Sequence, residues 1–295
     1  MDTTSPLSIL VLMVCRNRRE TTLQAIERIR RQAPATHVSI ALFDDASDDG
    51  TPQAVADAHP DVTIVHGDGN AFWNGGLHQL WSQVKDARVD AFLWLNDDTW
   101  LDDDAFARLQ ATWNDMASER GDTRFILVGA TRDTDGSISY GGYDLEDTPL
   151  AFRLKAVPPL DTQLRAITTF NGNAVLVSKA AADRIGINDP AYFHNLGDVD
   201  YGLRAKKADI PVMLLPGTIG VCEGNKAKSQ RGYGSPLLSV REQWRKVNTH
   251  HGLPFRSWWH FTRRHSGSYW PLHFLLPYRH LLFFWKRSMH GVNGA

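Results

Sequence analysis

The residues best suited to do chemistry are the acidic side chains in the run AFLWLNDDTWLDDDAF, residues 91–106. The apolar residues 91–95 predict a buried strand that stops at Asn96. Asp97 and Asp98 would then lie at a strand end, where open α/β sheets bind their ligands. Adjacent carboxylates repel each other, and a divalent cation that also holds a phosphorylated ligand would neutralise them. A polar turn, followed by a helix that residues 102–104 cap, explains the same sequence equally well.

Two further acidic motifs follow the same logic. FDDASDDGT, residues 43–51, places Asp45 after a predicted strand, and NLGDVDYGLRAKK, residues 195–207, places Asp198 and Asp200 at the start of a predicted helix. Each motif alone also fits a structural role: a turn with Asx hydrogen bonds around Asp45, and a helix N-cap at Asp198. A cap and a catalytic base are compatible at Asp198.

Strands that alternate with helices must position these motifs. The sequence predicts strands at residues 7–14, 38–43, 62–65, 91–95 and 125–130, and helices at 20–32, 51–58, up to 84, and 103–118. The third helix follows a glycine-rich loop, GDGNAFWNGG. This alternation predicts an α/β fold with a doubly wound, mostly parallel sheet. Hairpin or edge strands, a strand with a glycine break at 167–178, a helix at 198–208 and a strand at 212–216 are expected after residue 130.

The charge distribution divides the chain. The net charge is −1, but residues 226–295 hold 12 Lys and Arg against a single acid, Glu242. We therefore predict a catalytic part at residues 1–222, a mobile basic loop at 223–235 and a helical, basic and aromatic region at 236–295. Two cysteines are too few for a disulfide framework and favour a reducing compartment. We expect no signal peptide and no membrane-spanning segment.

The C-terminal region combines aromatic residues with Arg and Lys, as in SWWHFTRRH and SYWPLHFLLPYRHLLFFWKR. This composition is typical of helices that lie on an anionic membrane surface. The alternative is a helical subdomain, or a dimer surface, whose aromatic residues form a core. Nucleic acid is the less favoured partner, because no recognised binding motif accompanies the positive charge.

Together with CRNR, residues 15–18, the three acidic motifs resemble the inverting family 2 glycosyltransferases, over roughly residues 7–222. The closest likeness is to bacterial polysaccharide enzymes that include rhamnosyltransferases. The resemblance implies a GT-A fold with a helical C-terminal extension, and metal-dependent transfer of a sugar, with rhamnose suggested, from a dTDP- or UDP-sugar. A lipid-linked glycan hydroxyl in cell-surface polysaccharide such as O-antigen would be the acceptor, and the protein would be cytoplasmic and peripheral on the inner face of the cell membrane.

The resemblance also implies donor-binding residues. Asp45 would accept a hydrogen bond from the pyrimidine imide, and Asp98 would bind Mg²⁺ or Mn²⁺ as the variant DxD motif. The other residues expected around the donor are Arg16, Asn17, Arg18, Trp73, Asn74, Gly75, Asn96 and Asp97. An interior position explains Trp73 about as well, and Cys15 stands where the family usually has an aromatic-type residue.

On the acceptor side, the resemblance implies that Asp198 is the catalytic base. Asp200 would orient the site or contact the acceptor, and Lys226, Lys228 and Arg231 would close over the diphosphate from a mobile loop. Two positions depart from the family pattern. Gly197 replaces an acid, and no His follows the strand near residue 220, where Cys222, Glu223 and Asn225 occur.

Those departures keep a second function open, a non-catalytic nucleotide- or glycan-binding module of the same fold. A sugar-nucleotide pyrophosphorylase is less favoured, because CRNRRETT lacks the glycine-rich loop such enzymes place after the first strand.

Overall fold

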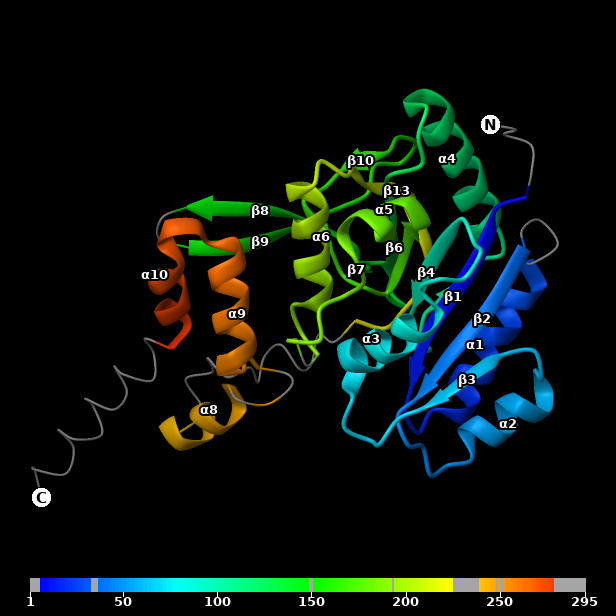
Figure 1. The fold of residues 1–295 in the computed structure, drawn as a ribbon, viewed down its shortest axis with the longest axis horizontal. Helices are drawn as coiled ribbons and strands as arrows, with labels where there is room; N and C mark the ends of the chain where they lie inside the picture. The colour runs from blue at the N-terminus through cyan, green and yellow to red at the C-terminus, as the bar shows by residue number, and fades with distance from the viewer. Residues whose placement is uncertain are drawn as a thin grey trace, which may run out of the picture.

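Two sheets organise the chain (Figure 1). The structure is a computed structural model that describes residues 6–32, 37–148, 151–192, 194–224, 239–247, 249 and 252–278. Within these ranges a large mixed sheet has the strand order β10-β13-β6-β12-β4-β1-β2-β3, and a small antiparallel sheet has the order β11-β8-β9.

Four parallel strands from the N-terminal part form one half of the large sheet. They are β1 Ser8–Cys15, β2 His37–Asp44, β3 Thr63–His66 and β4 Ala91–Leu95. The helices between them are α1 Arg19–Gln32, α2 Thr51–Ala58 and α3 Phe72–Val84. β1 is apolar along its length because both faces of a parallel sheet are covered by helices. Ile9 and Val11 pack in one core, and Leu10 and Leu12 in the other.

A strand of opposite direction joins the two halves of this sheet. β12 (Ala174–Ser178) lies between β4 and β6 (Ile126–Arg132) and runs antiparallel to both. β13 (Val212–Val221) pairs parallel with β6. Because β12 is reversed, its beginning meets the end of β4, with Ala174 opposite Leu95. The short strands β5 Trp100–Leu101, β7 Ile138–Tyr140 and β10 Arg165–Ala166 lie at the margins.

Helices cover both faces of the large sheet. One hydrophobic cluster includes Ile26 of α1 and Phe106 of α4 (Ala105–Arg120). The other includes Trp81 of α3 and Tyr201 of α6 (Gly197–Lys207), and Trp94 of β4 packs its ring 5.4 Å and 4.9 Å from theirs. The predicted mostly parallel α/β sheet is confirmed. The short helix α5 Lys179–Ile185 was not predicted.

A small lobe stands beside the large sheet. It is built on β8 Gly142–Thr148, β9 Ala151–Val157 and β11 Thr169–Phe170, with helices α8 Val240–Val247, α9 Phe255–His265 and α10 Trp270–Leu275. Phe152 of β9 packs against Phe261 of α9 at 5.0 Å between ring centroids. Trp258, Phe261, Phe274 and Tyr278 are buried in this lobe. Much of the aromatic content of the C-terminal region therefore forms a core.

Candidate active site

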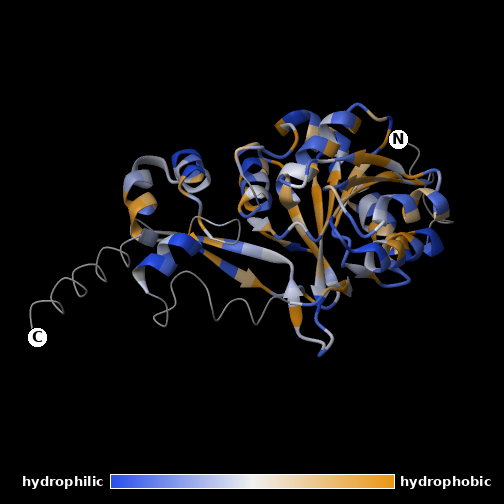
Figure 2. Cartoon of the chain, turned by 90° about the horizontal axis from the view of Figure 1, so that it is seen from below, coloured by the Kyte–Doolittle hydropathy of each residue, from blue (hydrophilic) through white to orange (hydrophobic). Residues whose placement is uncertain are grey.

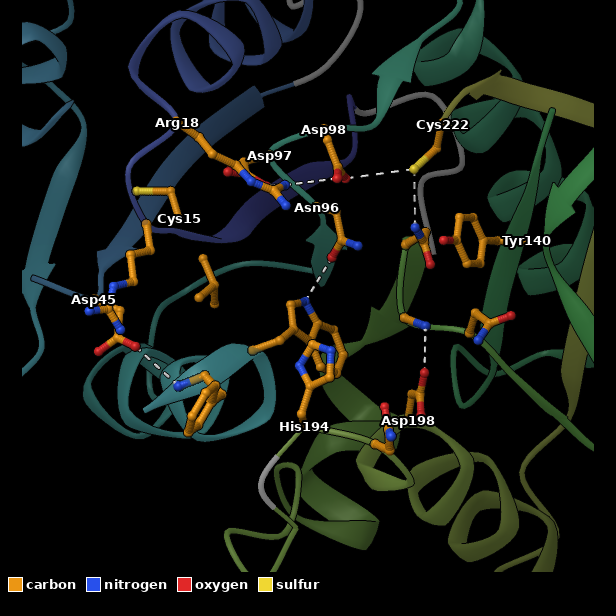
Figure 3. A pocket seen from close by; sticks show the side chains of 18 of the residues that line it. Cys15, Arg18, Asp45, Asn96, Asp97, Asp98, Tyr140, His194, Asp198 and Cys222 are labelled. Carbon is orange, nitrogen blue, oxygen red and sulfur yellow. Dashed lines mark hydrogen bonds and ion pairs between the residues drawn. The ribbon is translucent and has the colours of Figure 1, made fainter. Parts of the chain in front are cut away.

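A cleft of ≈ 620 Å³ opens at the carboxyl ends of β1, β2 and β4 and continues to the start of α6 (Figure 3). The predicted site residues that line it are Arg16, Arg18, Asp45, Trp73, Asn96, Asp97, Asp98 and Asp198. These residues come from five separate segments of the sequence. The parallel strands β1, β2, β3 and β4 bring the first four segments together, and the reversed strand β12 brings α6 close to them.

Asp45 follows β2 at the end of the cleft where the sequence predicts that the nucleotide base binds. Its carboxylate accepts backbone N–H groups from the glycine-rich loop: Gly69 at 2.9 Å, Ala71 at 3.3 Å and Phe72 at 3.1 Å. The residue is 2% exposed. A carboxylate offers about four acceptor positions, so three loop contacts leave room for one more donor. Asp45 thus fixes the loop and still faces the cleft.

Asp97 and Asp98 follow β4 and share one cation, the Arg18 guanidinium. One Arg18 nitrogen, Nη1, lies 2.8 Å from Oδ1 of Asp97 and 2.8 Å from Oδ2 of Asp98. Asp97 is buried, its second oxygen has no hydrogen-bond partner among the described residues, and its pKa is raised to about 7 because burial penalises the charge. The Asp98 side chain is 42% exposed to the cleft.

Cys222 occupies the neighbourhood where the family pattern suggests a histidine. Its sulfur lies 3.6 Å from Oδ1 of Asp98 and accepts a hydrogen bond from the Asn173 amide at 3.4 Å. Burial raises the pKa of this thiol to about 12, so it remains protonated and donates to Asp98. Glu223 also lines the cleft here. A thiol is a poor ligand for a hard cation, so oxygen atoms would have to supply the coordination.

The described residues contain no cluster of three or more His, Cys, Asp and Glu side chains that could hold a metal ion. A fully protein-built cage is therefore absent from this part of the chain. Mg²⁺ is commonly held by one or two carboxylates together with substrate phosphates and water. Asp98, together with the Asp97 oxygen that has no partner among the described residues, could supply the one or two carboxylate ligands that such an ion needs.

Asp198 lies at the opposite wall of the cleft, in the first turn of α6. Its carboxylate accepts the backbone N–H of Gly172 at 3.0 Å and of Val199 at 2.8 Å. Desolvation raises its pKa above the ordinary value, although these hydrogen bonds lower it in part. The local bonds serve the helix start, and the side chain still faces the cleft, so both roles foreseen for Asp198 are compatible.

Strained backbone is concentrated around the cleft. Four of the five described non-glycine residues with positive φ adjoin or line it: Asn17, Ala46, Phe72 and Leu196. Such conformations cost of order 1 kcal/mol or more each and often mark ligand sites. Phe72 and Leu196 begin the helices that carry Trp73 and Asp198, so the strain fixes how those two helices enter the cleft.

Three residues that were predicted to contact the sugar-nucleotide donor do not line the cleft. Asn17 does not line the cleft; it ties two loops together through Ser47 and Asp48. Asn74 is 0% exposed, and its amide donates to the carbonyls of Asp189 and Tyr192. Gly75, the next residue, is also absent from the lining. The prediction of sugar contact is therefore corrected for Asn74, whose polar atoms are used inside the protein.

Asp200 has a structural role instead of the predicted contact with acceptor or diphosphate. It is 0% exposed and receives Arg204 Nε at 2.8 Å, Arg264 Nη1 at 2.9 Å and His265 Nε2 at 2.8 Å. Two of these partners come from α9, so Asp200 joins α6 to the small lobe. Residues two positions apart in a helix point about 200° away from each other around its axis, so Asp200 points away from the cleft that Asp198 faces.

Lys226, Lys228 and Arg231 lie outside the described residues, and their predicted closure over the diphosphate stays a prediction.

Sequence reasoning missed the cleft residues that precede β12. Asn171, Gly172 and Asn173 line the wall between Asp98 and Asp198, joined there by Tyr140 and His194. The signal was the NGN triplet within a predicted strand, which was interpreted only as a glycine break. Gly172 packs so tightly against Trp73 that an added Cβ would lie 2.3 Å from the indole.

Comparison with known proteins agrees with this geometry. Residues 10–121 match the family model of Glycosyl transferase family 2. This range includes most of β1, all of β2 and β4, and the acidic residues Asp45, Asp97 and Asp98, but not Asp198. The N-terminal part of the chain is therefore similar to glycosyltransferase family 2. A relative in Mycobacterium tuberculosis, an N-acetylglucosaminyl-diphospho-decaprenol L-rhamnosyltransferase, is 26% identical over 205 residues. That match covers 61% of this chain and 64% of the relative, less than two thirds of its length.

Solved structures show that this chain has the GT-A fold. The mannosyltransferase PcManGT from Pyrobaculum calidifontis, solved with GDP-Man and Mn²⁺, has a TM-score of 0.53 at 16% identity, covering 100% of this chain and 78% of its own. GalNAc-T7, solved with UDP, GalNAc and Mn²⁺, has a TM-score of 0.56 at 13% identity, covering 90% and 52%.

The structure explains why residue 197 is glycine, where the family resemblance implies an acidic residue. A Cβ built on Gly197 would lie 1.9 Å from Oδ1 of Asn74. Asn188 donates to that same oxygen at 2.9 Å, so the amide cannot easily turn away. The fixed position of Asn74 therefore excludes a side chain at residue 197.

Proposed function

We propose that this chain transfers a sugar from a nucleoside-diphosphate donor to a glycan hydroxyl with inversion at the anomeric carbon. One observation carries the proposal: Asp45, Asp98 and Asp198, from three distant segments, line a single cleft in a chain whose N-terminal part is similar to this family. Their positions suit three separate tasks, namely binding the base, binding the diphosphate through a cation, and accepting a proton.

The nucleotide would lie across the ends of β1, β2 and β4. The free acceptor position on Asp45 matches the imide N–H of uracil or thymine, which only donates. Arg16 and Arg18 supply positive charge beside the diphosphate, and Trp73 offers an aromatic wall whose Nε1 is fixed by Asn96 at 2.7 Å. A dTDP- or UDP-sugar is therefore the proposed donor, with rhamnose suggested by the mycobacterial relative's name.

Asp98, with Asp97 beside it, would hold Mg²⁺ or Mn²⁺. Such an ion, when bound, neutralises the charge that develops on the leaving nucleoside diphosphate. Asp97 limits the flexibility of the site, because it is buried and anchored by Arg18. Cys222 stabilises the free carboxylate of Asp98 through its thiol.

Asp198 is the proposed base. It would take the proton of the acceptor hydroxyl as that oxygen attacks the anomeric carbon on the side opposite the diphosphate. The raised pKa makes the carboxylate a better proton acceptor than an exposed aspartate. The hydrogen bonds from Gly172 and Val199 hold it in place and stabilise the ionised form that the reaction needs.

The relative's name suggests a lipid-linked acceptor, which would place the reaction at a membrane surface. No described helix is both long enough and apolar enough to cross a bilayer. The lipid-linked acceptor in the relative's name is our reason to propose peripheral association at the inner face of the cell membrane, in cell-surface polysaccharide synthesis.

The first test combines a donor screen with one substitution. A matching nucleotide sugar with Mn²⁺ should raise the melting temperature, and ligand at 100 times its Kd stabilises by about 2.7 kcal/mol. Asp198→Asn should lower kcat for transfer by roughly 10²–10⁴-fold while leaving that thermal shift largely intact. Asp98→Asn should instead abolish the Mn²⁺-dependent part of the shift.

Comparable turnover in Asp198→Asn would remove Asp198 as the base. If no nucleotide sugar shifts the melting temperature with any divalent ion, the proposed donor chemistry fails. Donor binding without transfer or donor hydrolysis would favour the alternative, a non-catalytic binding module.

A further inference from the structure

Large hydrophobic side chains are exposed mainly on one part of this protein. Of the described residues, eight large hydrophobics are exposed, and six of them lie between residues 244 and 275: Trp244, Phe255, Trp259, Tyr269, Leu272 and Leu275. Monomeric proteins rarely expose apolar surface in such concentration without a partner. Figure 2 shows hydrophobic residues on the helices at the end of the small lobe that is remote from the large sheet.

The outer face of α9 is the centre of this surface. Phe255, Trp259 and Arg263 recur one helical turn apart and are all exposed, as is Arg256. Phe255 stacks on Trp259 with an interplanar angle of 13°, and Trp259 contacts Trp270 of α10 at 4.7 Å. The rings therefore form one continuous surface, and α10 exposes Leu272 and Leu275 next to it.

The charge on this face is positive and uncompensated. Arg256 and Arg263 form no ion pair with any residue that the structure describes. Arg263 lies over the rings of Trp259 and Trp270, 5.7 Å and 5.0 Å from their centroids. By contrast, Arg264 on the inner side of α9 is paired with Asp189 and Asp200. Arg264 therefore anchors the inner side of α9 to the protein through ion pairs, whereas Arg256 and Arg263 on the outer side can pair with an external anion.

We propose that the α9 face, defined as Phe255, Arg256, Trp259, Arg263 and Trp270, docks on an anionic lipid bilayer. Aromatic rings suit the boundary between head groups and acyl chains, and the guanidinium groups pair with lipid phosphates. Aromatic residues and Arg also occur in protein interfaces, so the test below includes a measurement of the oligomeric state. The inference deepens the proposed function, since a lipid-linked acceptor would meet the cleft at such a surface, but vesicle binding requires no turnover.

The test is vesicle flotation with the full chain, without donor or acceptor. Vesicles are phosphatidylcholine alone, or phosphatidylcholine mixed with an equal amount of phosphatidylglycerol. The wild type should float with the mixed vesicles and release as salt is raised. The double variant Phe255→Ser with Trp259→Ser, and the double variant Arg256→Glu with Arg263→Glu, should each weaken binding by at least about tenfold.

The matched control is Ile138→Ser with Leu160→Ser, because these side chains are 44% and 41% exposed but lie outside residues 244–275. It should float like the wild type, and all variants should keep the wild-type melting temperature within a few degrees.

Several outcomes would overturn the proposal. If the wild type does not float, the face does not bind lipid. If the Phe255 and Trp259 variant floats as well as the wild type, another segment, such as residues 279–295, binds the membrane. If light scattering shows a wild-type dimer that this variant converts to monomer, the face is a protein interface. Failure of sugar transfer with intact flotation would count against the proposed function alone.

Discussion

Arg18 is the residue that connects the two acidic positions of the cleft. Its guanidinium lies between Asp97 and Asp98, where it supplies the positive charge that the sequence led us to expect from a cation. A divalent ion bound to Asp98 would therefore compete with Arg18 for the same carboxylates. On this view, Arg18 balances the charge before donor and metal arrive and turns to the diphosphate afterwards.

Arg18→Met tests this competition. Without the guanidinium the paired carboxylates repel each other, so Mn²⁺ without nucleotide should bind roughly tenfold more tightly, a change of about 1.4 kcal/mol. Nucleoside diphosphate should bind more weakly. Calorimetric titration measures both affinities. Arg16→Met is the control, because Arg16 contacts the carbonyl of Gly69 instead of the acidic pair. Equal Mn²⁺ affinity in the two variants would contradict the competition.

The sequence predicted the acidic residues of the cleft but not all of its walls. Asp45 and Asp98 could be predicted because a buried strand that ends in carboxylates places them at the sheet edge. Asn171 and Asn173 could not, since a short apolar run does not reveal that β12 is reversed. The predicted acceptor contact of Asp200 could not be judged from the sequence, because its partners, Arg264 and His265, are more than sixty positions away and belong to the other lobe.

At the scale of elements, the start of α6 is fixed by its packing on α3. Gly197→Ala places a methyl group against Asn74, a fully buried residue with several hydrogen bonds. Overpacking of this kind costs about 1–3 kcal/mol. We expect a lower melting temperature, and reduced transfer because Asp198 is the next residue. Thermal unfolding measures the first effect and a transfer assay the second.

Gly75→Ala is the matched control for that substitution. Its Cβ would find only Ala71 at 3.8 Å, and alanine favours a helix by up to about 1 kcal/mol over glycine. Stability at or above the wild-type value is therefore expected. Equal melting temperatures for Gly197→Ala and the wild type would show that the start of α6 can adjust.

The contact between α6 and α9 depends on Asp200. Asp200→Ala leaves Arg204 without its carboxylate and leaves Arg264 with Asp189 as its remaining acidic partner. Breaking a buried ion pair from one side costs about 3–5 kcal/mol. Because Arg264 is about one-third exposed, the lower end of that range is expected. Chemical denaturation measures the loss. The control Asp183→Ala removes an exposed ion pair with Lys179 and should change stability by less than about 1 kcal/mol.

At the scale of the whole molecule, the junction between the lobes predicts a pH dependence. Burial lowers the pKa of His265 below 6.5. Burial alone would raise the pKa of Asp200, but the hydrogen bond from His265 and the positive charges of Arg204 and Arg264 together lower it below 3.8. For both groups the unfolded chain binds protons more readily than the folded one. The stability that they contribute is therefore present above the unfolded pKa and lost as pH falls towards the folded pKa.

We accordingly expect the contribution of this junction to the melting temperature to begin falling below about pH 6.5, with a further loss below about pH 3.8. Asp97, whose pKa burial raises to about 7, acts in the opposite direction over the same range, so the wild type is compared with a His265 variant at each pH. His265→Gln, whose amide can still donate to Asp200, should flatten the first part of this fall. Melting curves measured from pH 8 to pH 5, roughly the range in which histidine titrates, provide the measurement. An unchanged slope in His265→Gln would assign the titration to another histidine.

The reversed strand β12 has a consequence for how this chain is made. In the sheet order, β12 separates β4 from β6, so the strands translated first cannot join β6 and β13 until residue 178 has emerged. Until then, β4 and β6 each present an unpaired edge, and such edges are templates for aggregation. During synthesis from the N-terminus, β4 and β6 are therefore both complete before the strand that lies between them in the sheet is available. Chains truncated before β12 should consequently require chaperones or precipitate.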